Sequence, residues 1–157
     1  MSGEGCQSFN FQFSDQRTTR TKRLMLRRIH QLAAQNADFA FETTLASRTF
    51  VPLLRFWKEN GYDVNLLFIW LSSAELAIER VRSRVSAGGH AIDEAVIVRR
   101  YRKGLKNLVS LYLPIADKWS VFDNSAREPA LIAKRSPGGE LMVYDEGVWT
   151  RILKEGR

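Results

Sequence analysis

The sequence predicts an α/β fold in which a mostly parallel sheet is flanked by helices. Segments with strand character alternate with segments of helical periodicity, an order typical of parallel sheets covered by helices. Residues 63–71 are apolar almost throughout, as expected of a strand that is covered on both faces. The chain has 157 residues, which suits one domain with a substantial core.

Periodicity predicts the individual elements, because apolar residues at helical spacing indicate helices and short apolar runs indicate strands. In chain order we expect a helix over 18–36, a strand over 38–42, a helix over 49–60, a strand over 63–71, a helix over 73–87, a long helix over 93–111, a strand over 119–123, two weaker strands over 130–133 and 141–144, and a helix over 149–153.

Capping and breaking residues support these boundaries. Gly61 lies just past the second helix, and Gly88 and Gly89 follow the third. Ser73, or the serine before it, can cap that third helix. Pro114 ends or kinks the last turn of the long helix.

Composition excludes several classes of protein. Hydrophobic residues make up 45% of the chain and charged residues 26%, so disorder is expected only near the ends. Residues 1–17 show no stable period and are expected to be irregular or poorly ordered, followed by one domain over 18–157. Cys6 is the single cysteine, which excludes an internal disulfide and a cysteine-based metal site. No apolar run has the length of a membrane span and the N-terminus does not resemble a signal peptide, so we expect a cytoplasmic protein without a membrane partner.

The net charge of +7 favours an anionic partner. Nucleic acid and a phosphorylated small molecule both satisfy this, and charge alone does not choose between them. The basic residues are dispersed and no recognised nucleic-acid motif is present, so nucleic acid is the less favoured partner.

Candidate site residues follow the strand over 38–42. In open α/β sheets, ligands bind at the carboxyl ends of the strands. Glu42, Thr43 and Thr44 stand at such an end, with Arg48 four residues further on. A carboxylate and hydroxyls can hold a sugar by hydrogen bonds, and the alternative is a helix cap beside a solvated acid. Asn124 follows a later strand and is a second candidate position.

Arginines on two consecutive helices form another candidate group. Arg80 and Arg84 lie four residues apart along one edge of an apolar stripe, and Arg100 is on the next helix. Their planar guanidinium groups can bind phosphate oxygens in pairs. The alternative is that both helices simply expose solvated charges. His90 follows two glycines, and its role as a proton carrier, a phosphate ligand or a turn residue stays open. No spacing of histidine or carboxylate side chains in the sequence resembles a metal site.

Five motifs in order resemble the zeta-toxin-like kinases over roughly residues 23–125. They are Phe39–Arg48, Val64–Val81, Arg84–Ile92, which is similar to the family's lid, Arg100–Pro114 and Trp119–Ser125.

The resemblance implies a P-loop-kinase-like fold that uses ATP or GTP with magnesium. It implies phosphorylation of a small molecule such as UDP-N-acetylglucosamine, and an antitoxin protein as a partner. Glu42 and Thr44 would then bind the sugar of the substrate, with Arg48 and His90 as further candidates. The transferring phosphate would be contacted by Arg80 and by a lid arginine, Arg84 or Arg100. Asn124 would lie near the nucleotide base.

One departure from the family affects all these expectations. The phosphate-binding loop has the pattern G-x-x-x-x-G-K-[ST], and no segment of this sequence fits it. The strand before that loop is not recognised either, and Asp15 does not match the segment of the family's catalytic aspartate. We therefore expect a fold without the first strand and the loop, and a chain without kinase activity of its own.

Three explanations remain open. The favoured one is a truncated or frame-shifted gene product. The second is a non-catalytic relative that binds a nucleotide sugar or a protein, and the third is a chain that complements a polypeptide supplying the loop. A basic nucleic-acid-binding module and a protein-interaction remnant are the alternative functions.

Overall fold

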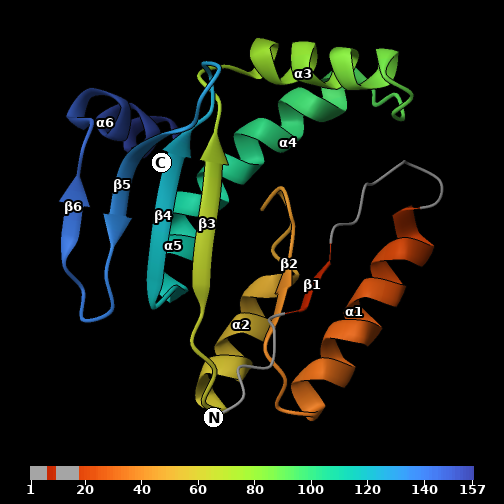
Figure 1. Ribbon diagram of the computed structural model, residues 1–157, viewed down its shortest axis with the longest axis vertical. Helices are drawn as coiled ribbons and strands as arrows, with labels where there is room; N and C mark the ends of the chain where they lie inside the picture. The colour runs from red at the N-terminus through yellow and green to blue at the C-terminus, as the bar shows by residue number, and fades with distance from the viewer. Residues whose placement is uncertain (1–6, 10–17) are drawn as a thin grey trace.

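Helices and strands alternate up to residue 86 as the sequence pattern predicts, whereas further helices follow one another up to residue 115 and three consecutive strands lie between 118 and 143 (Figure 1). The computed structural model describes residues 7–9 and 18–157. The elements are β1 (Gln7–Phe9), α1 (Thr18–Ala34), β2 (Phe39–Phe41), α2 (Phe50–Glu59), β3 (Asn65–Trp70), α3 (Ala74–Ser86), α4 (Glu94–Asn107), a π-helical turn (Leu108–Tyr112), α5 (Leu113–Ile115), β4 (Lys118–Asp123), β5 (Ala130–Arg135), β6 (Leu141–Val143) and α6 (Glu146–Glu155).

The main sheet is mixed, which corrects the expectation of a mostly parallel one. Its strand order is β3-β4-β5-β6, with β3 parallel to β4 and the other neighbouring pairs antiparallel. The short connections 124–129 and 136–140 explain this, because a parallel pair needs a crossover of a dozen or more residues. Gly138 and Gly139, both with positive φ, turn the chain between β5 and β6.

The N-terminal segment contains a strand that the sequence did not predict. Residues 7–9 form β1, which pairs in parallel with β2, so the expected irregular segment is corrected at these positions. The other residues of 1–17, Asp15 included, lie outside the described part of the chain. A single domain over 18–157 stays a prediction.

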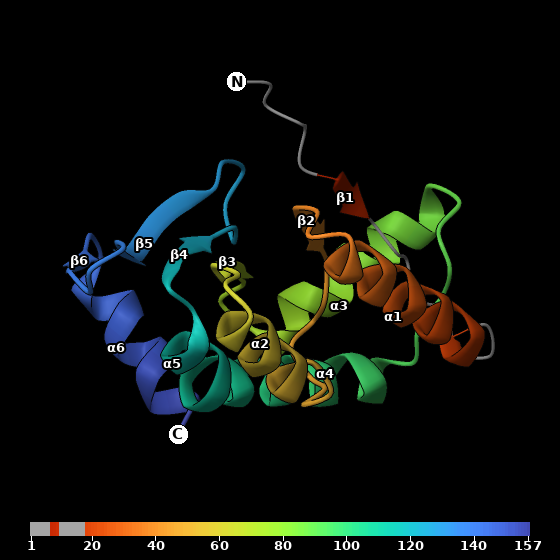
Figure 2. The same ribbon diagram turned by 90° about the horizontal axis from the view of Figure 1, so that it is seen from below.

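One hydrophobic cluster runs through the described structure. It includes Met25 and Ile29 of α1, the strand residue Trp70, and Leu108 in the π-helical turn. Figure 2 shows α2, α4, α5 and α6 along the same side of the main sheet. Among the described residues, no helix combines the length and the apolar character needed to cross a bilayer.

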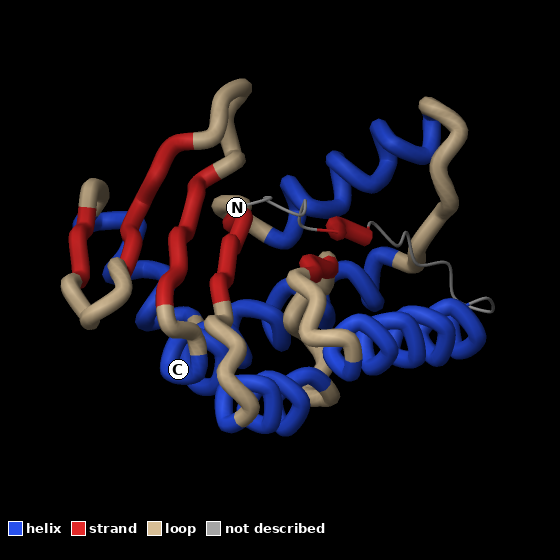
Figure 3. The backbone as a smooth tube through the Cα atoms, turned by 60° about the horizontal axis from the view of Figure 1, so that its bottom comes forward, coloured by secondary structure: helices blue, strands red, loops and turns tan. Residues whose placement is uncertain are grey.

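The two sheets are separate. No strand pairing joins β2 to β3 in the described residues, and Figure 3 shows β1 and β2 as a short pair apart from the four-stranded block. An ion pair bridges the two parts at the amino ends of the strands: Lys58 Nζ lies 2.8 Å from Asp117 Oδ1. Asp117 also accepts a hydrogen bond from the Val64 amide at 2.7 Å.

Candidate functional site

A cavity of about 910 Å³ opens where the carboxyl ends of β2 and β3 meet α3 and α4. Glu42 and Thr44 line it from the loop after β2. Arg84 of α3 and Arg100 of α4 line it from the helices. The structure therefore brings together four of the candidates that the sequence indicated.

The cavity combines two free cations with acceptor and hydroxyl groups. Within the described structure, neither Arg84 nor Arg100 forms an ion pair or a side-chain hydrogen bond with another protein group. Arg84 is exposed and Arg100 is half-buried. Guanidinium groups without a protein partner suit phosphate oxygens, and a carboxylate with a hydroxyl suits a sugar.

The loop that carries Glu42 and Thr44 is held by the backbone of α4. At Gly104 an added Cβ would lie 2.4 Å from the Thr44 carbonyl oxygen. No side chain fits into that distance, so glycine allows the loop and the helix to approach this closely. Leu45, the next residue of the loop, is buried and has a positive φ of 56°. Such a conformation is uncommon for leucine and persists because its surroundings hold it.

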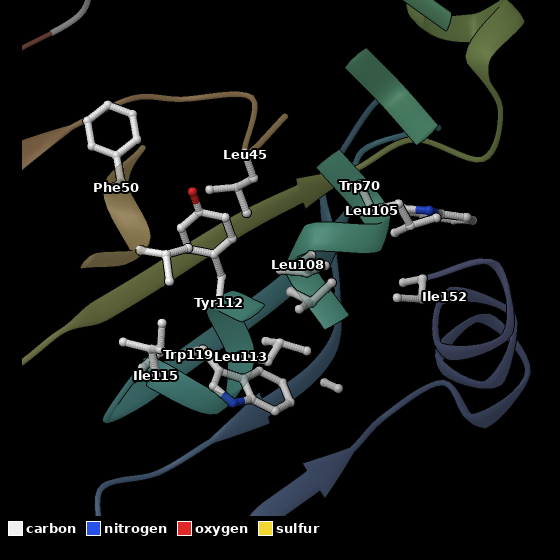
Figure 4. Packing of buried hydrophobic residues seen from close by; sticks show 14 of the residues in the cluster. Leu45, Phe50, Trp70, Leu105, Leu108, Tyr112, Leu113, Ile115, Trp119 and Ile152 are labelled. Atoms are coloured by element: carbon white, nitrogen blue, oxygen red, sulfur yellow. The ribbon is translucent and has the colours of Figure 1, made fainter. Parts of the chain in front are cut away.

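Two further side chains fix the same loop. Asn107 is only 4% exposed, and its Nδ2 donates to the Leu45 carbonyl at 2.7 Å. Tyr112 donates its hydroxyl to the Ser47 carbonyl at 2.6 Å. Figure 4 shows this hydroxyl pointing towards the segment that carries Leu45. Tyr112 belongs to the π-helical turn, a widened helix geometry that often occurs at functional sites.

Tyr101 of α4 connects the helix side of the cavity to the end of β3. Its hydroxyl donates to the Leu71 carbonyl at 2.8 Å, just after β3. Burial raises the pKa of Tyr101, and the Glu155 carboxylate adds to the rise. Burial also raises the pKa of Tyr112. Both phenols therefore stay protonated, as hydrogen-bond donors, throughout the neutral range.

Four of the expected site residues, namely Arg80, Arg48, His90 and Asn124, are not part of the cavity lining. The Arg80 guanidinium donates to the backbone carbonyl of Asn124 at 2.8 Å and to that of Ala126 at 3.4 Å. It therefore braces the loop after β4 and does not line the cavity with Arg84. Arg48 and His90 are exposed and also lie outside the cavity lining.

Sequence reasoning missed the residues that hold the loop, namely Gly104, Asn107 and Tyr112. One signal was available for the first: a glycine inside a helix costs about 1 kcal/mol relative to alanine, so it often marks a close contact. No local pattern distinguishes the other two, because their partners are 62 and 65 residues away in the chain.

The residues present do not fit the magnesium nucleotide that the resemblance implies. The sequence contains no G-x-x-x-x-G-K-[ST] run, so the backbone amides, lysine and hydroxyl of that loop are missing from it. In the part of the chain that the structure describes, no group of three or more histidine, cysteine or carboxylate side chains is arranged to hold a metal.

Comparison with known proteins gives three findings. The sequence model of the zeta toxin family matches residues 10–135. An uncharacterized protein of Haemophilus influenzae is 33% identical over 72 residues, which are 46% of this chain and 51% of that protein. The chain thus spans about half the length of this curated relative.

The third finding is structural. A solved chain from the PezAT chromosomal toxin–antitoxin system of Streptococcus pneumoniae superposes with a TM-score of 0.52 and 15% identity. The match covers 88% of this chain and 60% of the other. At this identity the likeness shows a shared fold.

Proposed function

Because this chain belongs to the zeta toxin family, we propose that it is a kinase-type domain that binds a phosphorylated small molecule, such as a nucleotide sugar. The observation that carries this proposal is the cavity at the carboxyl ends of β2 and β3. Glu42, Thr44, Arg84 and Arg100 all line it, although they come from three separate segments. Ligands of open α/β sheets bind at such a position.

Each side chain has a defined role in this proposal. The Glu42 carboxylate accepts hydrogen bonds from sugar hydroxyls, and the Thr44 hydroxyl donates or accepts beside it. Arg84 and Arg100 bind phosphate oxygens through their paired N–H groups. Arg80 has a positioning role, because its guanidinium holds the loop of Asn124, where the family resemblance places the nucleotide base.

We further propose that the chain as given does not transfer phosphate on its own. Phosphoryl transfer depends on positioning and on neutralising the charge of the phosphates. The loop, lysine and magnesium hydroxyl that perform both tasks in a P-loop enzyme are missing from this sequence. Arg84 and Arg100 act on one phosphate group and do not replace a loop that surrounds several.

Calorimetry with UDP-N-acetylglucosamine tests the binding site. Glu42→Ala is expected to weaken binding by at least about tenfold, since it removes a charged hydrogen-bond acceptor. Arg84→Gln and Arg100→Gln are expected to weaken it similarly. Arg82→Gln is the matched control, because Arg82 is on the same helix but pairs with Glu94 at 2.5 Å, outside the cavity. Equal effects of all three arginine variants would contradict the proposal.

An antitoxin-type protein is the proposed partner, and the cytoplasm the proposed location. The support for the partner is the family and the fold shared with a chain from a toxin–antitoxin system. The nucleic-acid alternative would be favoured by two results together: the protein binds plain DNA with an affinity that falls steeply as the salt concentration rises, and it does not bind the nucleotide sugar.

A further inference from the structure

The outer face of α4 carries a stripe of positive charge. Four exposed cations at helical spacing form this basic stripe, namely Arg99, Arg102, Lys103 and Lys106. Since a helix has about 3.6 residues per turn, all four fall within an arc of about 100°. The contacts that α4 makes with the loop of Glu42 come from its buried side instead, at Gly104. Figure 2 shows α4 at the margin of the molecule, so the stripe faces outwards.

No acidic side chain balances the stripe. The carboxylates of Asp93 and Glu94 are at the amino end of α4, where the first caps the helix and the second pairs with Arg82. In the described structure, none of the four cations forms an ion pair or donates a side-chain hydrogen bond. Other helices differ, because Lys58 of α2 and Arg151 of α6 each pair with a carboxylate. The stripe therefore stands as a cluster of unneutralised charges.

The fold itself gains little from this arrangement. Like charges three or four residues apart on a helix repel each other, and the stripe contains such pairs at 99–102, 99–103, 102–106 and 103–106. The helix dipole favours a cation in the last turn, which accounts for Lys106 alone. A partner with matching negative charges converts this repulsion into attraction.

The dimensions of the stripe favour an acidic helix over nucleic acid. From residue 99 to residue 106 the helix rises about 10 Å, which is also two turns of an opposing helix. Proteins held on DNA by its phosphates neutralise about six to ten of them, whereas the stripe offers four cations. The exposed residues at either end of the same face, Ala95 and Ser110, provide no ring on which a base could stack.

The matching helix does not come from the described part of this chain. No described helix contains more than two carboxylates, so a second copy does not supply the helix either. Helices that pack permanently within one protein bury apolar side chains, and the stripe exposes none. Contacts made by charge alone suit a separate protein that associates and dissociates.

We propose that the basic stripe binds an acidic α-helix of a partner protein. Carboxylates at positions i, i+3, i+4 and i+7 of that helix lie on one face, so they can pair with all four cations. Arg99 and Arg102 each offer paired N–H donors to a carboxylate, which makes their contacts the stronger ones. The proposal concerns the outer face of α4 and does not depend on ligand binding in the cavity.

Binding of two peptides tests this surface. Both are labelled, alanine-rich helices of about 18 residues with four glutamates. The striped peptide has its glutamates at i, i+3, i+4 and i+7, and the control peptide has them spread around the helix. At low ionic strength, where exposed ion pairs are screened least, fluorescence anisotropy is expected to show at least about fivefold tighter binding of the striped peptide. Equal affinities, or no binding of the striped peptide, would overturn the proposal.

Two double variants separate the stripe from the overall charge. Arg102→Gln with Lys103→Gln removes two cations of the stripe, and Arg127→Gln with Lys118→Gln removes two exposed cations elsewhere. Both proteins have the same net charge, and all four positions are exposed, so both are expected to fold. The first pair is expected to weaken binding of the striped peptide by at least about fivefold, and the second by less than about twofold. Equal weakening would show attraction to the net charge and would overturn the proposal.

A short DNA duplex tests the competing class of partner. If the stripe is built for an acidic helix, DNA responds only to the net charge, and the two double variants are expected to lose DNA affinity equally. A loss at least about fivefold larger for Arg102→Gln with Lys103→Gln would assign the stripe to nucleic acid and overturn the proposed partner.

Discussion

The two parts of this molecule are built by different means. The part formed by β3 to β6 has a continuous hydrogen-bonded sheet, with the stacked rings of Trp119 and Trp149 between β4 and α6. The part formed by α1, α2, β1 and β2 has one short strand pair, and no strand in the described structure joins it to the main sheet. Side chains must therefore hold the two parts together. Most of the specific contacts come from α4 and the turn after it, and they converge on the loop that carries Glu42.

The contact at Gly104 gives the strongest test of this difference. Gly104→Ala is expected to destabilise the fold by about 2 kcal/mol, because its Cβ would lie 2.4 Å from the Thr44 carbonyl. Denaturant unfolding measures the change.

Gly147→Ala is the matched control for that substitution. Gly147 is also in a helix, but its added Cβ would be 3.5 Å from the nearest atom, the Asp145 Oδ1. This variant is expected to be neutral or more stable by up to about 1 kcal/mol, because alanine favours helices. Similar changes at the two glycines would mean that the contact with the loop is unimportant.

Asn107 and Asn60 sharpen the comparison, because each donates its Nδ2 to a backbone carbonyl at 2.7 Å. Asn107 is buried and Asn60 is exposed. Asn107→Ala is expected to cost about 2 kcal/mol, since the Leu45 carbonyl loses its partner away from water. Asn60→Ala is expected to cost less than about 0.5 kcal/mol. Thermal unfolding of both variants decides whether burial makes the difference.

Tyr112→Phe removes the contact with the Ser47 carbonyl but keeps the packing of the ring. A loss of about 1 kcal/mol is expected. Burial raises the pKa of Tyr112 in the folded chain, so its contribution is present below the unfolded pKa of about 10 and is lost as pH rises through the folded value. Stability measured between neutral and strongly alkaline pH is expected to fall less in the variant. An identical decline in both proteins would exclude this tyrosine as the cause.

The ion pair between Lys58 and Asp117 is expected to contribute least. Both side chains are 33% exposed, so Asp117→Asn is expected to cost about 0.5–1 kcal/mol at neutral pH. Hydrogen bonding to Lys58, and then to the Val64 amide, holds the pKa of Asp117 below its usual range. Its stabilisation is therefore present above about pH 4 and is lost as pH falls through the lowered pKa. The measurement is the free energy of unfolding of the unsubstituted protein and of Asp117→Asn as a function of pH. Values that converge in acid would confirm this expectation, and a difference that stays constant with pH would contradict it.

The sequence predicted the helices and strands from residue 18 onwards well, because periodicity and caps act locally. Ser73, for example, accepts a hydrogen bond from the Leu76 amide at 3.1 Å, as expected of a helix cap. The four-residue spacing of Arg80 and Arg84 suggested one shared task, but the side chains diverge. The carbonyl groups that bind Arg80 are 44 and 46 residues away, and no local pattern shows them.

The sheet was predicted less well than its strands. The apolar run of β3 suggested a strand covered on both faces, yet Leu67 and Ile69 are exposed. The run was recognised correctly, but which neighbours cover a strand is a property of the whole fold. The family's motifs led us to expect Glu42 and Thr44 beside Arg80 and one of Arg84 and Arg100. The structure places Glu42, Thr44, Arg84 and Arg100 on one cavity and leaves Arg80 outside it.

The tryptophans give each part of the molecule its own optical signal. The indole rings of Trp119 and Trp149 are 5.3 Å apart at 25°, close enough for their electronic transitions to couple and to produce a paired circular dichroism band. Trp57 is in the other part, edge-on to Phe39 at 5.2 Å, and its share of the fluorescence is the signal that a Trp57→Phe variant removes. A single titration can therefore follow both parts without any added label. Non-coincident transitions would reveal a state in which the loop of Glu42 has separated while the main sheet persists.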